Sequence, residues 1–135
     1  MARTKKINYT YAKGRRREAS ARVRLHKGKG ESLVNDVPIN KYFPGDVNQT
    51  LLLKPFVLTK TSDKFYLTAK VTGGGQKGQL GAVILGISRS LAEMNGEFRP
   101  ILKKAGLLTR DSRIRERRKV GMGGKARRKK QSPKR

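Results

Sequence analysis

The sequence contains no cysteine and no tryptophan, and it has a single histidine, His26. Without thiols the chain cannot form disulfides, and thiolate metal sites are excluded as well. His26 has no second imidazole and no paired carboxylate near it in the sequence, so it supplies neither a metal site nor a catalytic triad. The nine acidic residues are scattered, as is typical of turn, cap and surface positions. We therefore expect no catalytic residue, no metal and no cofactor.

Long apolar runs are missing too, and none approaches the roughly 20 residues that a membrane-spanning helix needs. Residues 1–11 lack the apolar core of a secretory signal. Their basic, acid-free composition weakly resembles an organelle transit peptide, but residues 9–13 already have the pattern of a strand. We therefore favour a strand at the start of the folded domain over a transit peptide. We expect a reducing, cytosol-like compartment and no membrane partner.

Aromatic residues are few, at four tyrosines and four phenylalanines. Single-strand binders combine a basic groove with several aromatic side chains on which bases stack. Phe65 is predicted to be buried and Tyr66 to lie on the opposite face of its strand. The sparse aromatics do not indicate a base-stacking platform.

Positive charge, by contrast, is abundant. The chain has 34 Lys and Arg against 9 Asp and Glu, a formal net charge of +25. Such a charge repels itself and disfavours a compact state unless a dense counter-charge lies nearby. Duplex nucleic acid carries one phosphate charge for about every 1.7 Å of its axis, so it is the partner that this composition favours.

The charge is unevenly distributed. Residues 1–29 carry a net charge of +10, residues 30–109 only +4, and residues 110–135 again +11. Beyond Thr109 the apolar residues are too widely spaced to build a core, and three glycines loosen the backbone. We therefore predict a globular domain at 1–109 and an extended basic tail at 110–135, which becomes ordered on RNA. A generic basic tail without a defined path is the alternative.

The globular part has the pattern of an α+β fold. Alternating apolar and polar residues predict half-buried strands, and an apolar stripe at three- and four-residue steps predicts a helix that covers the sheet. Gly81, Ala82 and Gly86 would allow that helix to approach the sheet closely. The expected strands are 9–13, 19–25, a short return strand at 32–35 after the turn at 28–30, and 65–71; the expected helices are 76–94, 97–105 and a possible short one at 46–54.

A glycine loop at 73–78 follows a strand and opens a helix, and it formally fits the dinucleotide fingerprint G-x-G-x-x-G. However, Glu93, at the spacing of the acidic residue of that fingerprint, falls late in the same helix and not at the end of a second parallel strand. Lys77 is followed by Gly78 and not by Ser or Thr, so the loop is no P-loop either. We favour contact between this loop and an RNA backbone; the alternative is that the glycines only permit tight turning and helix–sheet packing.

Arginines cluster before and along the second strand. Arg22 and Arg24 share one face, and residues 15–17 add three more guanidinium groups at a glycine turn. The guanidinium fork matches two phosphate oxygens at once, so such a cluster suits a nucleic-acid backbone. The bland alternative is a solvated outer face.

Four blocks of sequence occur in order along nearly the whole chain. They are GRRREASARV at 14–23; Asn35 with Tyr42 and Phe43; the signature Gly73-Gly74-Gly75, Gly78-Gln79, Gly81-Ala82 and Gly86-Ile87-Ser88-Arg89; and LKKAGLLTRD at 102–111 with Arg113, Glu116 and Arg117. Together they make the chain similar to the ribosomal protein S nine family of the small subunit, in its bacterial form. Several long blocks in the right order are far more specific than any one of them.

This resemblance implies a small mixed four-stranded sheet packed by two to three helices, like the second domain of ribosomal protein S five, with a long basic C-terminal extension. It also implies a structural role in the head of the small ribosomal subunit. We expect a cytoplasmic ribosome; an organelle ribosome is the less favoured alternative. The implied partners are small-subunit rRNA, peptidyl-site tRNA and neighbouring proteins of the head, with no homo-oligomer. In the family the tail threads inward, and its final Lys-Arg approaches the anticodon stem-loop of the tRNA.

From the residues and the resemblance together we predict two sets of contacts. The residues expected to bind rRNA are Arg15, Arg16, Arg17, Arg22, Arg24, Gly74, Gly75, Gln76, Lys77, Arg110, Arg113, Arg117, Arg118, Lys119, Lys125, Arg127, Arg128, Lys129 and Lys130. The residues expected to contact tRNA are Lys134 and Arg135. The rival interpretations are a DNA-compacting protein and a nucleotide-dependent enzyme that uses the glycine loop; no helix-turn-helix pattern supports the first.

Overall fold

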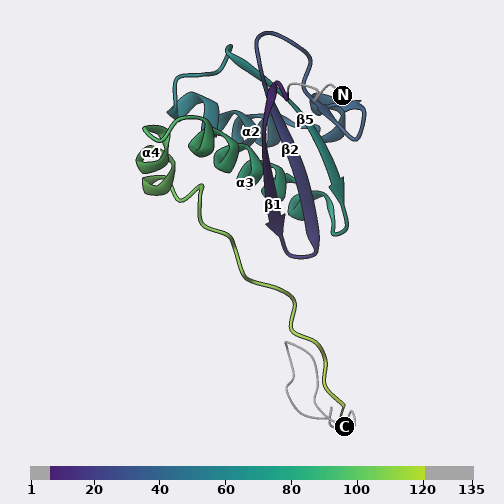
Figure 1. The fold of residues 1–135 in the computed structure, drawn as a ribbon. Coiled ribbons are helices and arrows are strands. Elements are labelled where there is room, and N and C mark those ends of the chain that lie inside the picture. Colours follow the sequence, from purple (N-terminus) through teal and green to yellow (C-terminus); the bar gives the residue numbers. More distant parts are fainter. Residues whose placement is uncertain (1–6, 121–135) are drawn as a thin grey trace, which may run out of the picture.

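A computed structural model describes residues 7–120. The fold is α+β, with one mixed five-stranded sheet and four helices (Figure 1). The strands lie in the order β1-β2-β5-β3-β4. Their bounds, with those of the helices in chain order, are β1 (Tyr9–Arg16), β2 (Ala19–Lys27), β3 (Leu33–Val34), β4 (Val37–Pro38), α1 (Ile39–Tyr42), α2 (Asp46–Leu58), β5 (Phe65–Thr72), α3 (Gln76–Met94) and α4 (Phe98–Lys104).

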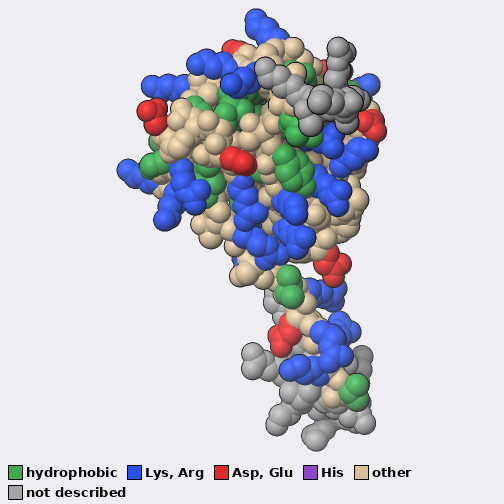
Figure 2. Space-filling model, in the orientation of Figure 1, with side chains coloured by type: hydrophobic (Ala, Val, Ile, Leu, Met, Phe, Trp, Pro, Cys, Tyr) green, Lys and Arg blue, Asp and Glu red, His purple; other side chains and the backbone are tan. Residues whose placement is uncertain are grey.

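The three long strands form the body of the sheet. β1 and β2 make an antiparallel hairpin, and β5 pairs antiparallel with the other edge of β2. Along β2 the small and aliphatic residues from Ala19 to Leu25 are buried, while the residues between them are exposed or half-buried. This is the predicted two-residue period. The outward positions carry many basic side chains, which gather over the β1–β2 hairpin in Figure 2.

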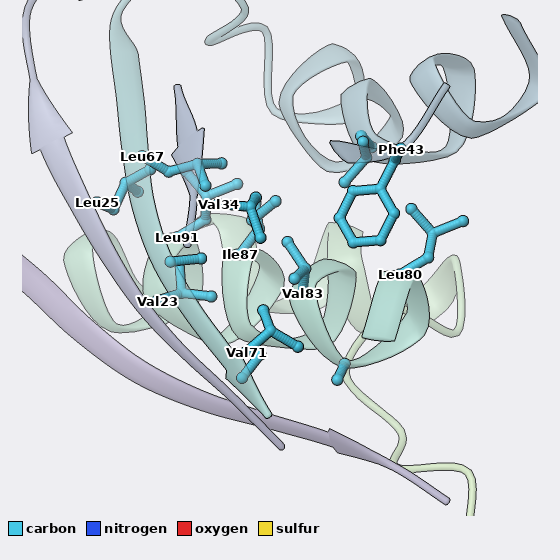
Figure 3. Close-up of a cluster of buried hydrophobic side chains, with 14 of the residues drawn as sticks. Val23, Leu25, Val34, Phe43, Leu67, Val71, Leu80, Val83, Ile87 and Leu91 are labelled. Carbon is cyan, nitrogen blue, oxygen red and sulfur yellow. The ribbon is translucent and has the colours of Figure 1, made fainter. Parts of the chain in front are cut away.

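The long helix α3 covers the inner face of this sheet (Figure 1). Its predicted apolar stripe is confirmed: Leu80, Val83, Ile87 and Leu91 are buried in one cluster with Val23 and Val71 of the sheet, and Leu80 lies beside Phe43 (Figure 3). Phe43, Leu25 and Val34 complete a core of large, fully buried side chains. Burial of each such side chain contributes about 1.5–3 kcal/mol relative to exposure.

Glycines, which have no side chain, allow α3 to approach β1 and β2 closely. A Cβ built on Gly14 would lie 1.7 Å from the carbonyl oxygen of Ala82, and one built on Gly86 would lie 2.5 Å from the side chain of Val23. The predicted role of Ala82 and Gly86 in helix–sheet packing is thus confirmed. Gly81 serves a different purpose, because its surface is covered by the side chain of Arg16.

The short strands correct two predictions. The predicted return strand at 32–35 does not pair with β2, because β5 occupies that edge; instead β3 pairs parallel with β5. The sheet also has five strands and not four, since β3 pairs antiparallel with β4 through a two-residue turn. Asn35 and Asp36 have φ angles of 50° and 64° in that turn, as a type I′ hairpin requires. A strand of two residues is too short to show a period in the sequence.

Asn35 also ties this region to the start of α3. Its side-chain oxygen accepts a hydrogen bond from the amide of Val71 at 2.9 Å, and its nitrogen donates to the carbonyl of Val71 at 3.0 Å. The same amide group donates to the hydroxyl of Tyr42, which donates in turn to Gln79 of α3 at 2.8 Å. One polar chain therefore joins β5, α1 and α3.

The described part of the chain has four helices and not two to three, because α1 is a single turn that the sequence did not reveal. The helix expected at 46–54 continues to Leu58 through Pro55. Proline in a helix removes one backbone donor and costs about 3 kcal/mol. Here Pro55 is buried with Leu52 and Phe56 against the core, and their burial offsets that cost.

After α4 the chain reverses at Gly106 and leaves the body. Gly106 has a φ of 74°, and the amide of Leu107 bonds back to the carbonyl of Leu102, which is a helix C-cap. From about residue 110 to residue 120 the chain is extended and runs away from the sheet (Figure 1). No helix within residues 7–120 is long and apolar enough to cross a membrane.

Candidate nucleic-acid interface

The outer face of the sheet carries no helix among the described elements, and the strand register decides what lies on it. Paired residues of neighbouring strands point to the same side. The register therefore sets four rows of three residues across β1, β2 and β5: Tyr9, His26 and Tyr66; Tyr11, Arg24 and Thr68; Lys13, Arg22 and Lys70; and Arg15, Ser20 and Thr72. We call these twelve positions the open face.

The open face carries five cations and no acid. Lys13, Arg22 and Lys70 are all exposed and stand directly opposite one another in a single row. Like charges directly opposite in a sheet are destabilising. Arg15 and Arg24 add two more exposed charges in adjacent rows. The negative charges of a polyanion lying on this face would relieve that repulsion.

An aromatic row closes one end of the open face. The rings of His26 and Tyr66 are stacked with centroids 4.9 Å apart, and Tyr9 lies tilted against His26 at 5.6 Å. The guanidinium carbon of Arg24 lies 5.2 Å from the centroid of the Tyr9 ring, within cation–π range. The sequence did not predict this cluster, because only the register of β1, β2 and β5 brings the three rings together.

His26 is half-buried in this row. Its Nε2 lies 3.1 Å from the hydroxyl of Thr68. Burial, assisted by the positive charge of Arg24, lowers the pKa of His26 below its usual value. The imidazole is therefore neutral near pH 7 and adds no charge to the open face.

The tip of the β1–β2 hairpin meets the glycine loop. Arg17 forms the turn with a φ of 53°, and Arg15 and Arg17 are exposed there. A Cβ on Gly73 would lie 2.7 Å from the carbonyl oxygen of Glu18, and one on Gly74 would lie 3.0 Å from Ala19. These two glycines therefore permit tight packing, which is the alternative to RNA contact.

The rest of the loop leaves room for a ligand. A Cβ on Gly75 would meet nothing within 4 Å, and both Gly75 and Lys77 are exposed. Gln76, predicted to touch RNA, donates at 3.3 Å to the carbonyl of Tyr42 and so has a structural partner. RNA contact by Gly74, Gly75, Gln76 and Lys77 stays a prediction.

Arg16 lies apart from the other arginines of its cluster. It points away from the open face, and its side chain lies over Gly81 of α3. Its Nε lies 3.8 Å from a carboxylate oxygen of Asp111, at the base of the extension. A shallow cleft of about 270 Å³ opens there, with Arg15, Arg16 and Asp111 among its lining residues.

Asp111 also organises the first residues of the extension. It accepts hydrogen bonds from the side chain of Arg113, at 2.8 Å for the shortest, and from the Arg113 backbone amide at 3.1 Å. These bonds hold the pKa of Asp111 well below its usual range. The carboxylate is thus charged at any physiological pH, and it links Arg16 of the body to Arg113 of the extension.

The remaining basic residues of the extension are solvent-exposed as far as they are described. Arg110, Arg117, Arg118 and Lys119 all belong to this exposed set. The other predicted contacts lie outside the described residues: Lys125, Arg127, Arg128, Lys129, Lys130, Lys134 and Arg135. Their RNA or tRNA contacts remain predictions.

The structure brings together residues that the sequence alone had not joined. Lys13 and Lys70 flank Arg22 but were absent from the predicted contacts, as was Tyr11. The sequence does indicate that Lys13 lies on the outer face, since Lys13 and Arg15 alternate with Ala12 and Gly14 along β1. Within residues 7–120 no group of three or more His, Asp or Glu residues lies close enough to hold a metal ion.

Comparison with known proteins adds independent findings. A family model described as ribosomal protein S9/S16 matches residues 14–135. The small ribosomal subunit protein uS9 of Rickettsia rickettsii (strain Sheila Smith) is 50% identical over 125 residues, which cover 93% of this chain and 78% of the relative. The uS9 proteins of Rickettsia africae (strain ESF-5) and Rickettsia felis (strain ATCC VR-1525 / URRWXCal2) are 50% identical over the same length, covering 78% and 77% of those relatives.

Proposed function

The chain belongs to the ribosomal protein S9/S16 family, and from this premise we propose that its open face and its basic extension bind small-subunit rRNA in the head of the subunit. Membership in this family makes the chain a structural component of the small ribosomal subunit and not an enzyme. Its partners are rRNA and other ribosomal proteins, and it is located in ribosomes in the cytoplasm.

One observation carries the proposal for the body: the row of Lys13, Arg22 and Lys70. Three exposed cations stand opposite one another across three strands, with no acid on the open face. The repulsion within the row is released when phosphates lie between the cations, and each phosphate contact releases condensed counterions from the nucleic acid. The body thereby fixes its position on the rRNA, while base-specific contacts are not required.

The extension supplies the second part of the proposed interface. Residues 110–135 carry 13 basic and 2 acidic residues, and the described part is extended and exposed. An extended basic segment follows the irregular surface of a folded RNA better than the regular groove of a DNA duplex. Where this segment leaves the body, its Asp111 carboxylate lies 3.8 Å from Nε of Arg16.

We further propose that Lys134 and Arg135 contact the anticodon stem-loop of peptidyl-site tRNA, as the family resemblance implies. In the family the tail usually ends in Ser-Lys-Arg, whereas here Pro133 separates Ser132 from Lys134. The proline fixes one backbone angle and removes one amide donor. The two terminal charges are retained, and charge is what a contact to the tRNA backbone needs.

Deletion of Lys134 and Arg135 tests the tRNA contact. Two exposed charge contacts are each worth up to about 1 kcal/mol, so we expect peptidyl-site tRNA to bind up to about thirtyfold more weakly. The measurement is tRNA affinity for small subunits at physiological salt. The control variant, Lys134→Arg with Arg135→Lys, keeps both charges and should retain the affinity. Equal affinity for the deletion and the wild type contradicts the contact.

The experiment that tests the main proposal is sedimentation of a cell lysate that contains the tagged full chain. We expect the chain to migrate with small ribosomal subunits and to be released by high salt, because phosphate contacts weaken steeply with salt. Migration with chromosomal DNA, or as the free protein at physiological salt, contradicts the proposal. Competition between structured rRNA and duplex DNA for the purified chain separates RNA binding from DNA compaction.

A further inference from the structure

Tyr11 occupies the second row of the open face, between the aromatic row and the row of three cations. We propose that Tyr11 is a stacking platform for an unpaired nucleobase of the bound RNA. This inference rests on the proposed function, since it assumes that RNA lies on the open face. It adds a base contact to an interface that the charges alone would explain by phosphates.

Tyr11 differs from the other rings of the open face in its surroundings. Tyr9 is covered by Arg24 and packs against His26. Tyr66 stacks on His26, and the loop at Gly30 lies so close that a Cβ there would be 2.9 Å from the Tyr66 ring. The Tyr11 ring has neither an aromatic nor a cationic partner among residues 7–120, and Tyr11 is 39% exposed.

The burial pattern gives Tyr11 no role in the core. Its neighbours Ala12 and Gly14 face α3 and are buried, whereas Tyr11 points to the opposite side. Tyr11 does not belong to the buried core cluster. A stacked base would cover the part of the ring that is now exposed, and stacking of this kind is worth about 1–3 kcal/mol per base.

The neighbouring charges fit a nucleotide that is bound in this way. Lys13 follows two residues later on the same strand face, about 7 Å along the strand, which is the dimension of one nucleotide. A base stacked on Tyr11 would therefore place an adjacent phosphate near the row of Lys13, Arg22 and Lys70. The base must be unpaired, because bases within an RNA helix are already stacked and their edges are paired.

The absence of tryptophan from the chain provides a direct probe. In the full-length chain with Tyr11→Trp, a single indole reports on the site. We expect its fluorescence to be quenched by a short single-stranded oligoadenylate and not by an abasic ribose-phosphate backbone of the same length. Val57→Trp is the control, since Val57 is 60% exposed on α2, in the helical layer that covers the inner face. Equal quenching of both indoles, or equal quenching by both ligands, overturns the proposal.

Affinity for an rRNA fragment from the subunit head provides a second readout. Tyr11→Ala should weaken binding about 5- to 150-fold, while Tyr11→Phe should bind like the wild type. The slope of log affinity against log salt should stay unchanged in Tyr11→Ala, because this variant still neutralises the same phosphates. In Lys13→Ala the magnitude of that slope should fall by about 0.7–0.9.

The outcomes separate this inference from the proposed function. Salt-dependent rRNA binding that is equally tight in the wild type and in Tyr11→Ala overturns the stacking role and leaves the proposed function intact. A wild-type chain that does not bind the rRNA fragment overturns the proposed function itself. If Tyr11→Ala lowers thermal stability, the quenching of Tyr11→Trp decides, since that variant keeps an aromatic ring on the strand.

Discussion

At the scale of single residues, His26 shows how the fold changes the chemistry of a side chain. It lies between two tyrosine rings and beside Arg24, so burial and the neighbouring positive charge lower its pKa. In the unfolded chain the pKa returns to about 6.5. As the pH falls through that value, His26 becomes protonated in the unfolded chain while it remains neutral in the folded chain. Protonation then favours the unfolded state, so this contribution to stability is present above about pH 6.5 and declines below it.

Replacement of His26 by Gln, which keeps a polar group near Thr68, removes this titration. We expect the free energy of unfolding of the wild type to fall more steeply than that of His26→Gln as pH decreases from 7.5 to 5. Urea denaturation of both proteins across this range measures the difference. Parallel pH profiles for the two proteins would show that His26 titrates alike in the folded and unfolded chains.

Single residues also mark what the sequence could predict of the interface. The alternation along β1 was visible, so Lys13 could have been placed beside Arg22 before the structure was known. The position of Arg16 could not, because its partners Gly81 and Asp111 are distant in the sequence and meet only after folding. The cluster of Tyr9, His26 and Tyr66 depends in the same way on the register of three strands.

At the scale of elements, the contact between α3 and the hairpin holds the open face in place. The helix approaches β1 at Gly14, where no side chain separates the strand from the carbonyl of Ala82. Since Ala21, Val23 and Leu25 of β2 are buried under the same helix, the outward rows of the sheet depend on this packing.

Gly14→Ala tests this contact. The added methyl group would overlap backbone atoms of α3, so we expect it to lower the free energy of unfolding by about 1–3 kcal/mol or more. Gly96→Ala is the matched control, because a Cβ at Gly96 would meet nothing within 4 Å. The midpoints of urea denaturation compare the two variants. Equal stability of both would mean that α3 does not lie as close to β1 as described.

Elements with a sustained period were predicted well, and short ones were not. The long strands β2 and β5 and the helix α3 bury one face each. Their apolar residues therefore recur with the period of a strand or of a helix, and this period can be seen in the sequence. The two-residue strand β4 and the single-turn helix α1 follow instead from a local turn at Asn35 and Asp36. The pairing of β3 with β5 is decided by which sheet edge remains available, and local sequence does not record this.

At the scale of the whole molecule, charge and core are segregated. The buried residues lie between the inner face of the sheet and α3 (Figure 3), whereas the cations lie on the surface. They include the five of the open face and those of the extension, and others lie elsewhere on the body, such as on α2 and α4 (Figure 2). With a formal net charge of +25, repulsion among the cations opposes the compact state of the free chain. The central claim is that rRNA completes this molecule by contacting the open face and the extension together.

The most direct test is the salt dependence of binding between the full chain and an rRNA fragment from the subunit head. The variant that changes Lys13, Arg22 and Lys70 to Gln is compared with a control that changes Lys54, Lys103 and Lys104, which lie on α2 and α4, to Gln, so that both variants have three fewer charges. We predict that the first variant lowers the magnitude of the log–log slope by about 2–3, at about 0.7–0.9 for each phosphate that is no longer neutralised, and that the control stays near the wild type. Equal slopes for the two variants would contradict an rRNA contact on the open face.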